Sequence, residues 1–259
     1  MSMTTRRVAV VTGGGRGIGA AIGRRLHADG CAVALADLDG AAAAAAAREL
    51  DPTGATAAGI GLDVADPESV RAGFAAVVAR WGRVDVLVNN AGVATLAPFL
   101  EFPAEAFARV MAVNVTGALL CAQAAARLMR ASGERPGGGR IVNIASVSGV
   151  RAGAGRTAYG TSKAALIGLT RQMAIELAPY AITANSVAPG PVETEMAQRL
   201  HSAEVRAAYR RQVPAGRYAA PEEIAAAVSW LAAPEAAYVT GVVLPVDGGF
   251  LAAGMLEEA

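Results

Sequence analysis

The sequence of 259 residues has few cysteines, few histidines and almost no net charge. Its two cysteines, Cys31 and Cys121, are too few for a disulfide framework, and neither belongs to a recognisable metal-ligand motif. We therefore expect buried thiols in a reducing cytosol and no metal site. The formal net charge is only +1 and there is no basic stripe, so the sequence does not indicate a nucleic-acid partner.

Long apolar runs are also missing. No uncharged apolar stretch reaches about 18 residues, the length that a membrane-spanning helix needs. Residues 1–7 lack the pattern of a secretory signal peptide. We therefore expect a cytoplasmic protein with no membrane contact.

Apolar side chains are abundant at 54% of the chain, although only 5% of the residues are aromatic. Short apolar runs alternate with segments of helical periodicity. We expect strands near residues 7–12, 32–37, 56–61, 84–89, 139–145, 182–187 and 242–246. We expect helices near residues 17–29, 40–50, 67–81, 103–131, 157–179 and 221–232. The glycine-rich segment 132–139 follows a helix and precedes a strand, so we interpret it as a connection and not as a phosphate loop.

This alternation predicts a single α/β domain over residues 1–259. Its core is a doubly wound, parallel, seven-stranded sheet with helices on both faces. Ligands of such sheets bind beyond the carboxyl ends of the strands. Residues suited to ligand binding fall at or just past these ends: Gly13, Asp37, Asp63, Asn89, Ser146 and Pro189.

The first expected strand leads into a glycine-rich turn. Gly13, Gly17 and Gly19 have the spacing Gly-x3-Gly-x-Gly, and a helical pattern follows at once. Glycines let the backbone approach a pyrophosphate closely, and a helix N-terminus offers free N–H groups and the positive end of its dipole. The turn predicts a dinucleotide site; the alternative is a tight turn chosen for its geometry alone.

Asp37 ends the second expected strand. A carboxylate at this position accepts hydrogen bonds from an adenosine ribose and repels a 2′-phosphate, which favours NAD over NADP. Arg16 is counter-evidence, because a basic residue in the glycine loop can bind a 2′-phosphate. We give Asp37 more weight because it occupies the discriminating position; the alternative is an ordinary acid in a turn.

Tyr159 and Lys163 are four residues apart, so they share one face if this segment is helical. A cation beside a phenol lowers the pKa of the phenol. A tyrosine tuned in this way can exchange a proton with an alcohol or a ketone. This spacing alone is common by chance. It indicates catalysis only together with the predicted nucleotide site, which would supply a hydride carrier.

The ordered motifs resemble those of the short-chain dehydrogenase/reductase family over about residues 6–250. They are the glycine loop at 12–19, Asp63-Val64, Asn89-Asn90-Ala91-Gly92, Asn114, the set Ser146, Tyr159 and Lys163, the segment Pro189–Thr194, and Val246–Gly249. The resemblance implies a Rossmann fold that binds NAD(P). Ala181 and Thr183 replace a glycine and a basic residue that many relatives carry, without an expected catalytic consequence.

The resemblance implies four catalytic residues. Tyr159 exchanges the substrate proton, and Ser146 binds the reacting oxygen. Lys163 binds the nicotinamide ribose and, with the positive nicotinamide ring, lowers the pKa of Tyr159. Asn114 holds a water that relays protons. The alternatives are a turn cap for Ser146 and a polar group at a helix kink for Asn114.

The resemblance also implies the cofactor contacts. Thr194 and the Val192 backbone hold the nicotinamide carboxamide, although Thr194 has the alternative role of a helix cap. The expected contacts are Gly13, Gly15, Arg16, Gly17, Ile18, Gly19, Asp37, Leu38, Asp63, Val64, Asn90, Ala91, Gly92, Tyr159, Lys163, Pro189, Gly190, Val192 and Thr194.

The substrate, by the same resemblance, is enclosed by residues 93–96, by residues 147–156 and by a substrate-loop insert at about 191–214. The candidate substrate contacts are Ser148, Arg156 and Pro191.

Two loop arginines, Arg151 and Arg156, precede Tyr159 closely. Either one could bind a carboxylate or a phosphate, whereas solvation or contact with a neighbouring subunit is the commoner role of such arginines. Of the two histidines, His27 lies on an expected surface helix, and His201 lies in the substrate segment where it could touch substrate.

Three functions remain. The first is an NAD-dependent dehydrogenase of a secondary alcohol, such as a polyol, sugar, hydroxysteroid or hydroxy acid, with Tyr159 as general acid and base. The second is an NADPH-dependent 3-oxoacyl-(acyl-carrier-protein) reductase, against which Asp37 argues. The third is a nucleotide-binding sensor without catalysis, against which the complete catalytic set argues. The resemblance and the apolar helices near 103–131 and 157–179 also imply a homotetramer.

Overall fold

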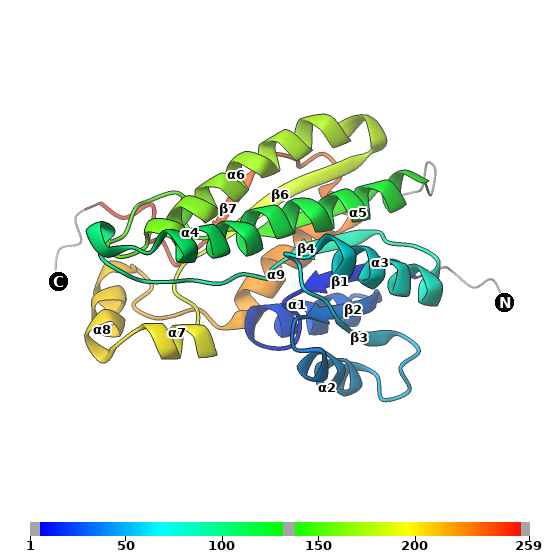
Figure 1. The fold of residues 1–259 in the computed structure, drawn as a ribbon, viewed down its shortest axis with the longest axis horizontal. Helices are drawn as coiled ribbons and strands as arrows, with labels where there is room; N and C mark the ends of the chain where they lie inside the picture. Colours follow the sequence, from blue (N-terminus) through cyan, green and yellow to red (C-terminus); the bar gives the residue numbers. More distant parts are fainter. Residues whose placement is uncertain (1–5, 132–137, 255–259) are drawn as a thin grey trace.

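The computed structural model describes residues 6–131 and 138–254, and its centre is a parallel sheet of seven strands (Figure 1). The strand order is β3-β2-β1-β4-β5-β6-β7, which confirms the predicted doubly wound sheet. The strands are β1 (Val8–Thr12), β2 (Ala32–Asp37), β3 (Ala57–Gly61), β4 (Val86–Asn89), β5 (Gly139–Ile144), β6 (Ile182–Pro189) and β7 (Val243–Val246). The chain order reverses between β1 and β4, and this is where such sheets bind their ligands.

Helices cover both faces of the sheet (Figure 1). They are α1 (Gly17–Ala28), α2 (Gly40–Leu50), α3 (Pro67–Trp81), α4 (Ala104–Met111), α5 (Ala118–Ala131), α6 (Thr157–Leu177), α7 (Glu195–Leu200), α8 (Ala203–Gln212) and α9 (Pro221–Ala232). Val8 and Val10 of β1 pack with α3, α5 and α6, whereas Ala9 and Val11 pack with α1, α2 and α9. Successive strand residues point to opposite faces, so a strand that is covered on both faces is apolar throughout.

Two parts of the predicted helical layout are corrected. The helix expected near 103–131 is interrupted by a π-helical turn at Ala112–Gly117. Helices α7 and α8 are absent from the predicted layout, and only the alternative role of Thr194 as a helix cap pointed to α7. The remaining expected helices and all seven strands are present, with ends that differ by a few residues at most. The predictions for residues 1–5 and for most of the 132–139 connection lie outside the described residues.

Helix starts follow from local chemistry. The Asp39 carboxylate accepts a hydrogen bond from the Ala42 N–H and so caps α2. Asp66 caps α3 in the same way, with Pro67 as the first helical residue. Helix α1 differs, since no side chain caps it and no acidic residue lies in its first turn. Its N-terminal N–H groups therefore remain available to an anion.

Within the described residues, one helical stretch, Ala104–Ala131, is long and apolar enough to cross a membrane by length and composition. Such a stretch also fits a core helix of a sheet protein. Cys121 and Ala125 of this stretch are completely buried in the core that covers the sheet.

Candidate active site

A cleft of about 890 Å³ lies at the carboxyl ends of the strands. Most of the predicted site residues line it: Gly13, Arg16, Gly17, Ile18, Asp37, Leu38, Asp63, Val64, Asn90, Ala91, Gly92, Ser146, Ser148, Arg156, Tyr159, Lys163, Pro189, Gly190, Pro191, Val192 and Thr194. Three predicted residues, Gly15, Gly19 and Asn114, are not among the lining residues. The cleft therefore unites sequence motifs from both halves of the sheet.

The glycine loop is built by backbone requirements. Gly13 and Gly17 have φ angles of 62° and 54°, a region that side chains disfavour. A Cβ atom at Gly19 would lie 2.0 Å from the Gly13 carbonyl oxygen, so Gly19 allows α1 to pack against the loop. Asn90 Nδ2 donates to the carbonyls of Thr12 and Gly13 at 3.0 and 2.9 Å and holds the loop from the neighbouring strand β4.

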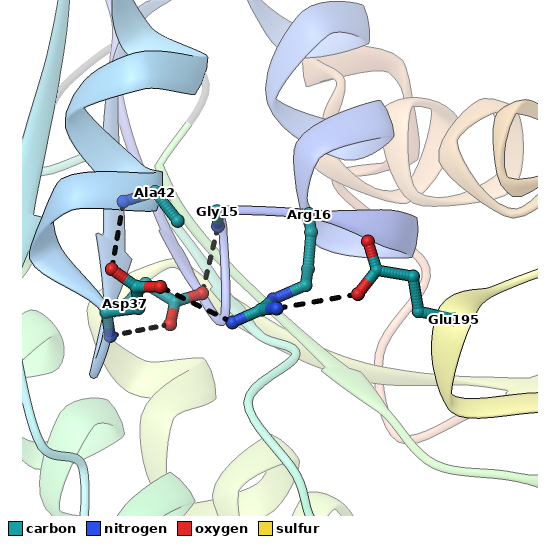
Figure 2. A network of polar contacts seen from close by, with 6 residues as sticks. Gly15, Arg16, Asp37, Ala42 and Glu195 are labelled. Atoms are coloured by element: carbon teal, nitrogen blue, oxygen red, sulfur yellow. Dashed lines mark hydrogen bonds and ion pairs between the residues drawn. The ribbon is translucent and has the colours of Figure 1, made fainter. Parts of the chain in front are cut away.

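Asp37 is fixed at the end of β2 by two backbone donors. Its carboxylate accepts from the Gly15 N–H at 2.9 Å and from the Asp39 N–H at 3.0 Å (Figure 2). Through the first of these bonds, Gly15 positions the Asp37 carboxylate although Gly15 itself does not line the cleft. Asp37 therefore has the turn-forming role of the alternative interpretation, and it also faces the cleft.

Arg16 connects the glycine loop to the other rim of the cleft. Its guanidinium lies 3.6 Å from the Asp39 carboxylate and 3.4 Å from the Glu195 carboxylate of α7 (Figure 2). All three side chains are about half exposed, so these ion pairs are weak. The positive charge of Arg16, which favoured NADP in the sequence, is thus shared between two carboxylates.

The reacting end of the cleft is formed by Ser146, Tyr159 and Lys163. Ser146 follows β5 and accepts a hydrogen bond from the Ser148 N–H at 3.1 Å, so the predicted alternative of a turn cap is correct. Its side chain is also hydrogen-bonded to the Tyr159 phenol. Lys163 is buried and donates to the Ile144 carbonyl at 2.7 Å. These contacts place a hydroxyl, a phenol and an amine at one wall.

The pKa values of this group differ from the expectation. Burial raises the pKa of Tyr159, and the hydrogen bond to Ser146 and the charge of Arg156 oppose this only in part. Burial lowers the pKa of Lys163 to about 8. The protein alone therefore does not give Tyr159 the lowered pKa that Lys163 was expected to produce. A contribution from the positive nicotinamide ring stays a prediction.

Asn114 lies in the π-helical turn and is almost completely buried. Its Oδ1 accepts from the Val93 N–H at 2.8 Å, and its Nδ2 donates to the Val93 carbonyl and to Ser162 Oγ at 3.0 and 2.9 Å. A Cβ atom at Gly92 would lie 3.3 Å from Asn114 Oδ1 and 3.5 Å from Lys163 Nζ. The amide therefore joins a cleft wall to α6. Its place in the π-helical turn agrees with the alternative of a polar group at a helix kink, and the proton relay stays a prediction.

Thr194 begins α7, since its hydroxyl accepts from the Ala197 N–H at 3.2 Å. The capping alternative for Thr194 is therefore correct, although the residue also lines the cleft. A Cβ atom at Gly17 would lie 3.7 Å from Thr194 Cγ2, so the glycine loop and the start of α7 face each other closely.

The structure separates the two loop arginines. Arg156 lines the cleft, whereas Arg151 stacks on the Phe250 ring at 5.4 Å and is not among the lining residues. His201 also lines the cleft and contacts the Arg156 guanidinium at 3.2 Å. His27 contacts Thr56 Oγ1 at 2.9 Å and lies outside the cleft lining, as expected.

Sequence reasoning missed Tyr209 of α8 and Glu195 of α7 as cleft residues. Both fall in or beside the stretch that was expected to enclose the substrate. The signals for their helices were the potential caps Thr194 and Ser202, each of which accepts a hydrogen bond from an N–H in the following turn.

The residues of the cleft fit a nicotinamide dinucleotide. The uncapped start of α1 and the left-handed glycines Gly13 and Gly17 suit the pyrophosphate. Asp37 suits the adenosine ribose at one end, and Lys163 and Thr194 lie where the nicotinamide half would be held. The cleft therefore contains groups suited to hold a dinucleotide beside a phenol that could exchange a proton.

Comparison with known proteins agrees with this geometry. A family model described as enoyl-(acyl carrier protein) reductase matches residues 13–251. The chain is 41% identical over 247 residues to a cis-4-hydroxycyclohexanecarboxylate dehydrogenase of Sinomonas cyclohexanicum, covering 95% of this chain and 97% of that protein. It is 41% identical over 243 residues to a 3-oxoacyl-(acyl-carrier-protein) reductase of Vibrio cholerae, with 94% and 96% covered. A crystal structure of a gluconate 5-dehydrogenase from Burkholderia cenocepacia, in complex with NADP and tartrate, is 37% identical, with a TM-score of 0.90 over 96% of both chains.

Proposed function

Because this chain belongs to the short-chain dehydrogenase/reductase family and is similar to dehydrogenases that act on CH–OH groups, we propose that it is an NAD-dependent dehydrogenase of a secondary alcohol. The family binds NAD(P), and the preference for NAD is the finer part of the proposal. The solved gluconate 5-dehydrogenase binds NADP, so this preference depends on the residues of the present chain.

The observation that carries the preference is the environment of Asp37. Its carboxylate is held by the N–H groups of Gly15 and Asp39 and faces the cleft. Arg16, the one residue of the glycine loop that favours a 2′-phosphate, already lies between Asp39 and Glu195. A 2′-phosphate would therefore lie near the carboxylates of Asp37 and Asp39. The nearby guanidinium of Arg16 is already paired with two carboxylates.

Bound NAD supplies the acceptor for the hydride of the alcohol carbon. Tyr159 takes the hydroxyl proton at its phenolic oxygen, and in the reverse direction it protonates the carbonyl oxygen. Ser146 donates to the reacting oxygen and stabilises the charge that develops there. Lys163 would hold the ribose of the cofactor, and the positive nicotinamide ring would favour the ionised form of Tyr159.

A substrate panel tests this proposal. The purified protein is mixed with secondary alcohols and either NAD or NADP, and absorbance of the reduced cofactor is followed. We expect turnover with NAD and a lower kcat/KM with NADP. No turnover with any alcohol or ketone would support the sensor alternative, and a preference for NADP would remove the argument from Asp37.

The second candidate is a 3-oxoacyl-(acyl-carrier-protein) reductase. It has the support of the Vibrio cholerae relative and of exposed arginines on α7 and α8, namely Arg199, Arg210 and Arg211. Cations at this rim suit the acidic surface expected of a carrier protein. Efficient oxidation of NADPH by 3-oxoacyl groups on a carrier protein, with weak activity toward free alcohols, would favour this candidate.

We also propose that the protein is a homotetramer in a reducing cytoplasm. Its described surface exposes apolar side chains on α6 and around α9 and β7: Ile175, Trp230, Tyr238 and Val242. Cys31 and Cys121 are free, buried thiols. Light scattering at working concentration tests the assembly, and a monomer would contradict it.

A further inference from the structure

The reacting end of the cleft contains a polar cluster that the proposed chemistry does not use. Arg156 precedes α6, His201 follows α7, and Tyr209 belongs to α8, and all three line the cleft with Tyr159. The chain thus brings three distant segments together beside the reacting atoms. The cluster consists of Arg156, His201, Tyr209 and the adjacent Tyr218.

Neutral groups hold the guanidinium of Arg156. Its Nη2 lies 2.9 Å from Tyr209 Oη and 3.2 Å from His201 Nε2. His201 Nδ1 lies 3.0 Å from Tyr218 Oη. Arg156 is always a donor, so Nε2 must accept and the imidazole must be neutral with its proton on Nδ1. Burial and the charges of Arg156 and Arg206 lower the pKa of His201, against the effect of Glu193, which agrees with this state.

Arg156 has no charged partner among the described residues. Other arginines of the described residues form ion pairs with carboxylates, for example Arg206 with Glu193. None of the described ion pairs includes Arg156. The described acids that line the cleft lie elsewhere. Three lie at or just past the ends of β2 and β3, namely Asp37, Asp39 and Asp63, and Glu195 faces Arg16. The reacting end therefore carries a partly buried positive charge without a counterion of its own.

The charge of Arg156 is felt at the reacting phenol, because it favours the ionised form of Tyr159. Arg156 and Tyr159 also line the same cleft, so one small molecule can contact both residues. A guanidinium presents paired N–H donors that match the two oxygens of a carboxylate. Tyr209 Oη can donate to the same anion.

We propose that the substrate is a hydroxy acid, or the corresponding oxo acid, whose carboxylate binds Arg156 and Tyr209 while its secondary alcohol meets Ser146 and Tyr159. This inference rests on the proposed dehydrogenase function and adds the substrate class to it. The alcohol C–H bond breaks with transfer of hydride to NAD, and the O–H proton passes to Tyr159. The products are the oxo acid, the reduced cofactor and one proton, and the carboxylate is unchanged.

The carboxylate is favoured over a phosphate by the composition of the cluster. One guanidinium, two phenols and a neutral imidazole offer a single positive charge, which matches one carboxylate. A phosphate dianion would leave a second negative charge beside His201 and the developing charge at Tyr159.

The chain offers a matched control. Arg151 lies in the same loop but stacks on Phe250 outside the cleft lining. Arg156→Gln removes the charge at the cleft, Arg156→Lys restores charge without the guanidinium fork, and Arg151→Gln removes a neighbouring charge. Thermal unfolding of each variant establishes that it is folded.

The test compares secondary hydroxy acids with their neutral methyl esters. The pairs are 2-hydroxybutyrate, 3-hydroxybutyrate, 4-hydroxypentanoate and 4-hydroxycyclohexanecarboxylate with the corresponding esters, all with NAD. We expect the wild-type enzyme to prefer at least one acid over its ester. Arg156→Gln should reduce this preference about 10- to 100-fold, mainly by raising KM for the acid. Arg156→Lys should recover part of the loss. Arg151→Gln should lower the acid preference far less than Arg156→Gln, because Arg151 reaches the cluster only through Phe250, whose ring packs on Tyr209.

The possible failures are distinguishable. The carboxylate assignment is overturned if the wild type oxidises the esters as efficiently as the acids. It is also overturned if Arg156→Gln lowers kcat/KM equally for acids and esters. In both cases the proposed dehydrogenase function stands. Absence of turnover with the acids and the esters, while a neutral secondary alcohol is oxidised, overturns the carboxylate assignment alone. Absence of turnover with every alcohol overturns both proposals. A binding measurement adds a readout without turnover. Cyclohexanecarboxylate, but not cyclohexanecarboxamide, should raise the melting temperature of the NADH complex in the wild type and not in Arg156→Gln. Stronger stabilisation by inorganic phosphate would assign the cluster to a phosphate instead.

Discussion

Lys163 Nζ lies 5.7 Å from the centroid of the Tyr159 ring, one helical turn along α6, and its hydrogen bond goes to the Ile144 carbonyl. The amine is therefore buried beside the phenol but anchored to the sheet. Burial shifts the two groups in opposite directions, raising the pKa of Tyr159 and lowering that of Lys163 to about 8. Each shift favours the uncharged form in the protein alone.

The lowered pKa of Lys163 predicts a pH-dependent stability. Between about pH 8 and the unfolded value of about 10.4, the unfolded chain holds a proton that the folded chain has lost, so stability rises with pH. Relative to Lys163→Met, the wild type should gain roughly 1–2 kcal/mol between about pH 7 and about pH 9.5. Urea unfolding of both proteins without cofactor measures this. A constant difference would show that Lys163 remains charged when folded.

Asp37→Asn is expected to move cofactor preference toward NADP. The amide retains an oxygen for the Gly15 or Asp39 N–H but loses the charge that repels a 2′-phosphate. The ratio of kcat/KM for NADP to that for NAD should rise by about tenfold or more. Asp66→Asn is the matched control because Asp66 caps α3 and does not line the cleft. An unchanged ratio in Asp37→Asn would remove Asp37 from cofactor selection.

The ion pair between Arg16 and Glu195 should slow cofactor release only slightly. Both side chains are about half exposed, and such pairs contribute at most about 1 kcal/mol, or about fivefold in rate. Stopped-flow release of NADH from Glu195→Gln should be up to about fivefold faster, and the difference should vanish at high salt. Glu222→Gln breaks the similar pair with Arg24 at 3.4 Å and should have no effect. A large or salt-independent change would indicate a different role for α7.

Two glycines should respond oppositely to alanine. At Gly19 a Cβ would lie 2.0 Å from the Gly13 carbonyl oxygen, so Gly19→Ala should shift the glycine loop and destabilise the fold by about 1–3 kcal/mol. At Gly168 in α6 a Cβ would meet nothing within 4 Å, so Gly168→Ala should stabilise by about 0.5–1 kcal/mol. Denaturant unfolding and NAD titration measure both effects. Similar behaviour of the two variants would contradict the packing described at Gly19.

The sheet was predictable because it is covered on both faces. Strands β1 and β4 are buried at every residue, so they stand out in the sequence as unbroken apolar runs. Helix α8 was missed because most of its side chains are polar or small and none of them is buried, so it offers no strong core-facing signal. The π-helical turn was missed because backbone bonding, and not side-chain pattern, distinguishes it from a regular helix.

The candidate site was predictable where its residues are close in sequence. The glycine loop and the pair Tyr159 and Lys163 are visible as spacings. The contacts between Arg156 and Tyr209, 53 residues apart, and between Arg16 and Glu195, 179 residues apart, depend on how the loops fold over the cleft. Periodicity carries no information about such pairs.

Tyr159→Phe shows whether Tyr159 moves the substrate proton in an NAD-dependent oxidation. Initial rates of NAD reduction are measured for the wild type and this variant with the best alcohol of the panel, and NADH titration confirms that the cofactor still binds. We expect kcat to fall by about 10²- to 10⁴-fold with little change in NADH affinity. A Tyr159→Phe enzyme that kept most of its turnover would contradict this role of Tyr159.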